Sequence, residues 1–164
     1  MASKKQPKLL IIEDDPYTSD IYFKVFAENG FDVIIFPDAD GYFAERVVEC
    51  APDIISMDIM IGKNGKPGER DGLEALELLK GDLRTHEIPI FILSNFFQEA
   101  GVKKARDLGA VDYLNSTGLK PSNVPSYYLN YLRNPKKYVP SHPLFKKEQK
   151  KNIRDISFLP RTKK

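Results

Sequence analysis

The chain has 164 residues, of which 41% are hydrophobic and 29% charged, as expected for one soluble globular domain. Its net charge of +2 hides an asymmetry: residues 1–134 hold 15 Lys and Arg against 21 Asp and Glu, whereas residues 135–164 hold 10 against 2. No apolar run approaches the ~18 residues of a membrane-spanning helix, and the single cysteine excludes an internal disulfide. We expect a cytoplasmic protein with one acidic domain, residues 1–134, and a basic, Pro- and Lys-rich tail, residues 135–164.

Short apolar runs alternate with amphipathic stretches along the first of these parts. The runs predict five buried strands, at 8–12, 32–36, 54–57, 89–93 and 110–114. Apolar side chains at helical spacing predict five helices, after Asp15, over 39–49, after Asp71, over 97–108 and from Val124. This alternation predicts an α/β fold with a doubly wound parallel sheet and helices on both faces.

Polar side chains follow three of the predicted strands directly. Glu13, Asp14 and Asp15 follow the first strand, Asp58 follows the third, and Ser94 ends the fourth. In a parallel sheet of this kind the functional crevice lies at the carboxyl ends of the strands, so these side chains are expected at one rim. A divalent cation relieves the repulsion among crowded carboxylates, and Mg²⁺ suits one or two carboxylates plus water. Asp15 alone has an ordinary explanation, as the cap of the helix that begins at Pro16.

Over residues 8–133 the sequence resembles the receiver domain of two-component response regulators. The resemblance lies in five segments that occur in the family's order: LLIIEDDP, PDIISMDIM, DGLEALELLK, IPIFILS and ARDLGAVDYL. It implies a flavodoxin-like five-stranded sheet with strand order 2-1-3-4-5. It also implies a module that is phosphorylated by a histidine kinase or a phosphotransfer protein and then signals by contact with a downstream protein.

The same resemblance implies a role for individual residues. The implied Mg²⁺ ligands are Glu13, Asp14, Asp58 and the backbone carbonyl of Met60. Asp58 is also the implied phosphoryl acceptor, Ser94 the hydroxyl that contacts the phosphoryl group, and Tyr113 the aromatic switch residue. A carboxylate can form an aspartyl phosphate, and a metal ion neutralises the transferring oxygens.

The sequence departs from the family pattern at the end of the fifth strand. Without a gap, Ser116 stands where the family has a lysine, and a serine donates a hydrogen bond but carries no charge. A gap would instead align Lys120, at the cost of four extra residues in a tight turn. A second departure is a long loop after Asp58, residues 62–70. The loop is either a plain surface insertion or the source of a substitute cation from Lys63, Lys66 or Arg70.

A third departure is Phe96, at a position that borders the path of the attacking water in the family, and it predicts slow hydrolysis of an aspartyl phosphate. The basic tail is too short for the usual DNA-binding output module. We expect it to be solvated, or to dock on the body or on a partner through two short apolar stretches, residues 143–145 and 156–159. Nucleic acid or an anionic surface would be bound only through this tail.

Two other functions stay open beside a phosphoacceptor receiver. A pseudo-receiver that binds its partner without phosphorylation is favoured by Ser116 and opposed by the intact acids. A Mg²⁺-dependent phosphohydrolase with an aspartyl nucleophile would commonly carry a second acid two residues after Asp58, where Met60 stands. We therefore expect no enzymatic activity apart from self-directed phosphotransfer and autodephosphorylation.

Overall fold

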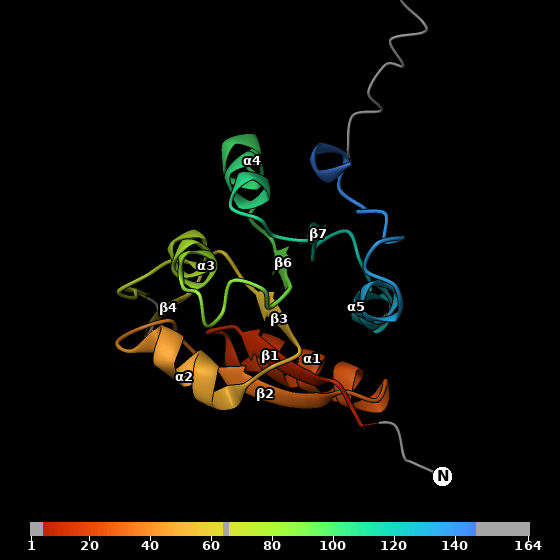
Figure 1. Cartoon of the computed structure of the whole chain (residues 1–164), viewed down its shortest axis with the longest axis horizontal. Helices are drawn as coiled ribbons and strands as arrows, with labels where there is room; N and C mark the ends of the chain where they lie inside the picture. Colours follow the sequence, from red (N-terminus) through yellow and green to blue (C-terminus); the bar gives the residue numbers. More distant parts are fainter. Residues whose placement is uncertain (1–4, 64–65, 147–164) are drawn as a thin grey trace, which may run out of the picture.

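The computed structural model describes residues 5–63 and 66–146, the side chains of Lys63, Lys66 and Pro67 excepted. Its centre is a five-stranded sheet in which every neighbouring pair is parallel, in the order β2-β1-β3-β6-β7 (Figure 1). The strands are β1 (Lys8–Ile12), β2 (Asp32–Phe36), β3 (Ile54–Met57), β6 (Ile90–Ser94) and β7 (Asp112–Asn115). Since β6 and β7 are the fourth and fifth strands of this sheet, the expected order 2-1-3-4-5 is confirmed.

The sheet separates two apolar cores because both of its faces are covered by helices. The central strands β1, β3 and β6 are buried along almost their whole length, which is why nearly all of their residues are apolar on both faces. Leu10 and Ile12 point into the larger core, and Leu9 and Ile11 point into the other. In Figure 1, α2, α3 and α4 cover the side of the larger core, and α1 and α5 cover the opposite side.

The helices begin and end largely where local signals place them. Their bounds are α1 (Pro16–Glu28), α2 (Phe43–Cys50), α3 (Gly72–Gly81), α4 (Glu99–Asp107) and α5 (Val124–Arg133), with a 3₁₀ turn η1 (Pro121–Asn123) before α5. Asp15 caps α1, accepting from the N–H of Thr18 at 3.0 Å. Asp71 caps α3 in a capping box with Glu74.

One predicted helix boundary was clearly wrong. The second helix was expected from residue 39, but α2 begins at Phe43. Gly41 has a φ of 59°, a left-handed conformation that a helix interior does not accept. Residues 38–41 therefore form a loop between β2 and α2.

The insertion after Asp58 contains structure that the sequence did not predict. Residues Gly62–Lys63 form β4 and Lys66–Pro67 form β5, and the two pair as a short antiparallel ribbon separate from the main sheet. Residues 64–65 lie outside the described part of the chain.

Beyond α5 the chain continues along the body as far as residue 146 and includes a 3₁₀ turn, η2 (Pro143–Phe145). Phe145 is only 8% exposed and belongs to the larger core, and Tyr138 packs against the other. The predicted tail therefore docks on the domain at these two residues, of which Phe145 lies in the apolar stretch 143–145, while half of the residues between them are exposed. Residues 147–164 lie outside the described residues, and the predicted division at residue 134 stays a prediction. No helix in the described ranges has the length and apolarity needed to cross a lipid bilayer.

Candidate functional site

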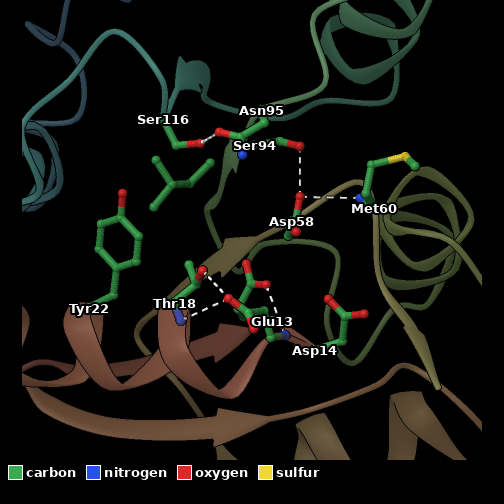
Figure 2. A pocket seen from close by; sticks show the side chains of 11 residues that line it. Glu13, Asp14, Thr18, Tyr22, Asp58, Met60, Ser94, Asn95 and Ser116 are labelled. Carbon is green, nitrogen blue, oxygen red and sulfur yellow. Dashed lines mark hydrogen bonds between the residues drawn. The ribbon is translucent and has the colours of Figure 1, made fainter. Parts of the chain in front are cut away.

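A pocket of about 260 Å³ opens at the carboxyl ends of β1, β3 and β6 (Figure 2). Ile12 is paired with Met57, and Met57 with Ile92, so the residues that follow these strands meet at one edge of the sheet. The lining residues are Glu13, Asp14, Asp15, Thr18, Tyr22, Asp58, Met60, Leu93, Ser94, Asn95 and Ser116. The pocket is where a doubly wound sheet is expected to hold its ligand.

Three carboxylates converge in this pocket. Glu13, Asp14 and Asp58 each offer an oxygen, and these oxygens all lie within 4.8 Å of one another. The N–H of Asp58 donates to the carbonyl of Ile12 at 3.0 Å, which continues the strand pairing and holds Asp58 beside Glu13. Asp14 is fixed by the insertion, because its Oδ2 accepts from the N–H of Gly62 at 3.1 Å.

The crowding changes the protonation of Glu13. Burial, together with the negative charge of Asp58, raises the pKa of the Glu13 carboxyl to about 9. A hydrogen bond from the N–H of Asp15, at 3.1 Å, works in the opposite direction and is outweighed. Without a cation, Glu13 therefore holds a proton at neutral pH.

The donor set fits a hard divalent cation. All three side chains supply carboxylate oxygens, and a cation beside them would replace the proton on Glu13 and offset the repulsion that holds it there. Mg²⁺ binds through one or two carboxylates and keeps several waters, and the open pocket leaves space for them. Glu13, Asp14 and Asp58 are the residues that would hold it.

Asp58 is oriented by two hydrogen-bond donors. Its Oδ1 accepts from the Oγ of Ser94 at 2.7 Å and from the N–H of Met60 at 3.2 Å (Figure 2). Ser94 is buried at the end of β6, so its hydroxyl is a fixed donor. Met60 lines the pocket, and the expected use of its carbonyl as a metal ligand stays a prediction.

A polar pair stands where the alignment without a gap places the family's lysine, at Ser116. Ser116 lines the pocket, and its hydroxyl donates to the side-chain oxygen of Asn95, which lines it too (Figure 2). Neither residue carries charge. Among the described residues, none that lines the pocket is a lysine or an arginine.

The candidate substitute cations have different surroundings. Lys120 is exposed and precedes the turn that leads into α5. The side chains of Lys63 and Lys66 lie outside the described residues, so their role stays a prediction. Arg70 does not line the pocket and is bonded elsewhere.

Arg70 fastens the insertion to the loop between β2 and α2. Its Nη1 donates to the carbonyls of Ala39 and Gly41, at 2.8 and 3.0 Å. The neighbouring Glu69 accepts from the N–H of Gly41 at 2.7 Å, and its own N–H donates to Oδ1 of Asp40 at 2.8 Å. The insertion is thus held beside the pocket, and the Arg70 guanidinium is used to hold it there.

The aromatic residue predicted as a switch is buried beside the site. Tyr113 is 1% exposed, and its hydroxyl donates to the carbonyl of Phe96. The N–H of Phe96 in turn donates to the Oγ of Ser94 at 3.2 Å. The Phe96 ring lies against Gly101 of α4 and does not line the pocket, whereas Asn95 does. The expected place of Phe96 beside the path of the attacking water stays a prediction.

Sequence reasoning assigned no role to three polar residues of the lining, Asn95, Thr18 and Tyr22. All three carried a usable signal. Thr18 and Tyr22 are four residues apart in a helix that begins at the end of the first strand, and residues at this spacing share one helix face. Asn95 directly follows Ser94, so its place at the rim could also have been inferred.

A doubly wound sheet with three acids and a hydroxyl at its carboxyl edge is the arrangement expected of a phosphoacceptor signalling domain. The family model for the response regulator receiver domain matches residues 9–123, and the chain belongs to this family, whose members receive a phosphoryl group in two-component signalling.

Three known proteins illustrate the relationship. The chain is 34% identical over 109 residues to the DNA-binding dual master transcriptional regulator RpaA of Synechocystis sp., a match that covers 66% of this chain and 42% of RpaA. Among solved structures, the BeF₃-activated N-terminal receiver domain of Klebsiella pneumoniae RstA matches with 25% identity and a TM-score of 0.61, covering 77% of this chain and 95% of that one. A CheY-like receiver domain protein from Methanospirillum hungatei shares the fold, with a TM-score of 0.69 at 16% identity over 81% of this chain and 98% of that one. The chain spans about two fifths of the length of RpaA, so the match concerns the receiver domain.

Proposed function

We propose that this chain is a receiver module that is phosphorylated on Asp58, with Mg²⁺ held by Glu13, Asp14, Asp58 and the carbonyl of Met60. One observation carries the proposal: the three carboxylates lie within 4.8 Å of one another, and Oδ1 of one of them, Asp58, is oriented by Ser94 and Met60.

The chemistry is an in-line phosphoryl transfer. A carboxylate oxygen of Asp58 attacks phosphorus; an O–P bond forms, and the P–N bond to the donor histidine of a kinase or phosphotransfer protein breaks. When bound, Mg²⁺ neutralises charge on the transferring oxygens. Ser94 then donates its hydroxyl to a phosphoryl oxygen instead of to Oδ1 of Asp58. Hydrolysis reverses the modification, because water attacks phosphorus and releases phosphate and the free carboxylate.

The polar pair of Ser116 and Asn95 makes this transfer slower than it would be beside a cation. A hydroxyl can bond a phosphoryl oxygen but does not offset its charge. Lys63 and Lys66 of the insertion remain the proposed sources of a substitute charge, since the insertion already contacts Asp14 through Gly62.

The proposed output is a contact with another protein through the face formed by α4 and β7. The only chemical activity we propose is transfer of a phosphoryl group from its donor to Asp58 and the later hydrolysis of that group. We propose that the chain acts in the cytoplasm, where the kinases that phosphorylate receiver domains expose their phosphorylated histidine. If the chain binds nucleic acid, it does so only through the basic tail.

The proposal is tested by the intact mass of the full chain after incubation with Mg²⁺ and acetyl phosphate. Attack on this donor breaks its P–O bond and releases acetate. We expect one phosphoryl adduct that disappears in Asp58→Asn. The adduct should persist in Asp53→Asn, a matched change at an exposed aspartate that directly precedes β3.

The pseudo-receiver is the alternative that Ser116 favours. If neither acetyl phosphate nor a histidine kinase gives an adduct while the chain is folded, the phosphoacceptor proposal fails and the pseudo-receiver replaces it. An adduct retained in Asp58→Asn would instead overturn the assignment of Asp58.

A further inference from the structure

Residues 135–146, which we call the strap, wrap around one edge of the sheet. β7 is the last strand in the sheet order of the described residues. On the α5 side of the sheet, Tyr138 packs edge-on against Phe91 and Tyr131, with ring centroids 5.6 Å apart in both pairs. On the α4 side, Phe145 enters the larger core, and Figure 1 shows the blue chain passing from α5 along β7 toward α4. The strap therefore joins the two faces of the sheet across β7.

A buried carboxylate of β7 holds the strap. Asp112 is 0% exposed, and its oxygens accept four hydrogen bonds. One comes from within β7, the N–H of Tyr113 at 2.8 Å. The other three come from the strap: the hydroxyl of Tyr138 at 2.6 Å, the N–H of Ser141 at 2.7 Å and the N–H of His142 at 3.1 Å. Asp112 is thus the chief polar anchor of this segment.

The contacts between the strap and the body are of a kind that can be broken without a large cost. The strap leaves a hollow of about 760 Å³ against the body, lined in part by Tyr131, Tyr138 and Phe145, so apolar packing beneath it is incomplete. If the strap lifts, water can replace its three donors to Asp112, and the carboxylate regains the hydration that burial removes. Opening therefore leaves no buried charge without a partner.

The strap also touches a chain of contacts that starts at the acidic pocket. Ser94 donates to Asp58 at 2.7 Å, and the N–H of Phe96 donates to Ser94 at 3.2 Å. The hydroxyl of Tyr113 donates to the carbonyl of Phe96. The Tyr113 ring meets the ring of His142, a strap residue, edge-on with centroids 5.9 Å apart.

We propose that the strap is a latch over the α4–β7 face, held closed by Asp112 and opened when phosphorylation of Asp58 shifts Ser94, Phe96 and Tyr113 against His142. This inference rests on the proposed phosphorylation of Asp58. A phosphoryl group draws the Ser94 hydroxyl away from Asp58, which disturbs the Phe96 bond to Ser94 and, through it, the position of the Tyr113 ring. A series of contacts couples two sites only if the element at its far end can adopt two conformations. In this proposal the strap is that element, with one conformation closed and one open.

The latch determines when the α4–β7 face is available. In the closed arrangement Phe145 and its neighbours in η2 lie beside α4, and Arg106 of α4 donates to the carbonyl of Leu144 at 3.2 Å. A protein that docks on this face competes with the strap. Phosphorylation would then expose the face and free the start of the tail in one step.

The test is hydrogen–deuterium exchange of the full chain, followed in peptides covering residues 138–146, with the adduct measured by intact mass in the same samples. With Mg²⁺ and acetyl phosphate we expect exchange of these amides to rise at least about fivefold, and not in Asp58→Asn. An adduct without this rise, or with slower exchange, overturns the latch and leaves the proposed function standing.

The anchor is tested without any phosphoryl donor. Asp112→Asn should raise strap exchange about tenfold, whereas Asp53→Asn, the same change at an exposed aspartate that precedes β3, should not. Tyr138→Phe removes one strap donor, keeps the ring and leaves β7 intact, so it gives the answer if Asp112→Asn does not fold. Unchanged exchange in the folded variant overturns Asp112 as the anchor.

The relay is tested separately in case no adduct forms, the outcome in which the proposed function itself fails. Ser94→Ala removes the hydroxyl that joins Asp58 to Phe96 and should raise strap exchange at least about threefold, while the exposed Ser126→Ala should have no effect. Equal exchange in the two variants overturns the coupling between the pocket and the strap.

Discussion

The hydroxyl of Ser116 donates to the side-chain oxygen of Asn95 at the rim of the acidic pocket. The Ser116 hydroxyl, which could otherwise donate to a phosphoryl oxygen, is therefore already bonded to the side-chain amide of Asn95. The pocket is also lined by four acids, Glu13, Asp14, Asp15 and Asp58, and those that are ionised repel an incoming phosphate unless a cation is present. With Ser116 and Asn95 in place of a lysine, the described lining of the pocket lacks a positive charge that would attract the phosphodonor to Asp58.

Ser116→Lys should speed the phosphorylation of Asp58 by a small donor. A lysine at this position places a positive charge beside the acceptor, where it attracts the donor and stabilises the charge of the transferring group. We expect a rise of about tenfold in the initial rate of adduct formation, followed by intact mass at fixed Mg²⁺. The control is Thr117→Lys, which adds the same charge at the next, exposed residue. Equal acceleration by both variants would mean that only the overall charge matters.

Mg²⁺ should bind more tightly as pH rises from 6 to 9. The pKa of Glu13 in the folded chain, about 9, lies above the ordinary value of 4.5, so the metal-free folded state holds this proton more tightly than the unfolded chain does. The resulting stability is fully present below about pH 4.5 and is lost as pH rises toward 9. Mg²⁺ replaces the proton, and its apparent affinity therefore gains up to about tenfold per pH unit in this window.

The measurement is the rise in melting temperature at fixed Mg²⁺, at pH 6 and at pH 8. We expect a clearly larger rise at pH 8 in the natural chain. Glu13→Gln cannot bind or release this proton, so its smaller Mg²⁺ response should be the same at both values. A natural chain with equal responses at both pH values would contradict the raised pKa of Glu13.

The strands and the acids of the site were predictable because local sequence specifies them. β1 and β3 have the expected bounds, since each is a mostly apolar run that stops at an acid, Glu13 or Asp58. A parallel sheet then requires those acids to meet at one rim. The start of α2 was not predictable, because the loop before it includes Gly41, whose N–H and carbonyl are bound by Glu69 and Arg70, 28 and 29 residues further on.

The docking of the strap was left open by the sequence, which offered residues 143–145 as a stretch that could bind the body, but its anchor was missed for the same physical reason. Residues 135–146 contain three lysines and three prolines, a composition that indicates a solvated segment. Its place on the sheet depends on Asp112, which Tyr138 reaches from 26 residues away. Side-chain bonds between distant positions leave no periodic signal in one sequence, so neither this anchor nor the Ser116–Asn95 pair could be inferred from it.

Arg70→Ala should loosen the insertion without slowing phosphorylation. The side chain makes two hydrogen bonds to the loop between β2 and α2, so we expect a loss of about 1 kcal/mol in the free energy of unfolding by urea and faster amide exchange in residues 62–70. The initial rate of adduct formation should stay within about twofold. A tenfold slower rate at full Mg²⁺ would show that Arg70 moves to the pocket and serves as the substitute cation.

Tyr128→Phe should destabilise the fold through a single buried hydrogen bond. The hydroxyls of Tyr128 and Ser56 lie 2.6 Å apart between α5 and β3, and both residues are buried. The variant keeps the ring, which stacks on Phe91 with centroids 4.4 Å apart, but leaves the Ser56 hydroxyl without its partner. We expect a loss of about 1–2 kcal/mol in the free energy of unfolding by urea.

The double variant Tyr128→Phe, Ser56→Ala removes both polar groups and should recover about half of this loss, because no buried hydroxyl is left unsatisfied. Tyr17→Phe, at a tyrosine that is 75% exposed, is the matched control and should change stability by less than about 0.5 kcal/mol. If the double variant is less stable than Tyr128→Phe by the full cost of a second independent change, the two hydroxyls do not act as a pair. The bond would then contribute nothing to holding α5 against the centre of the sheet.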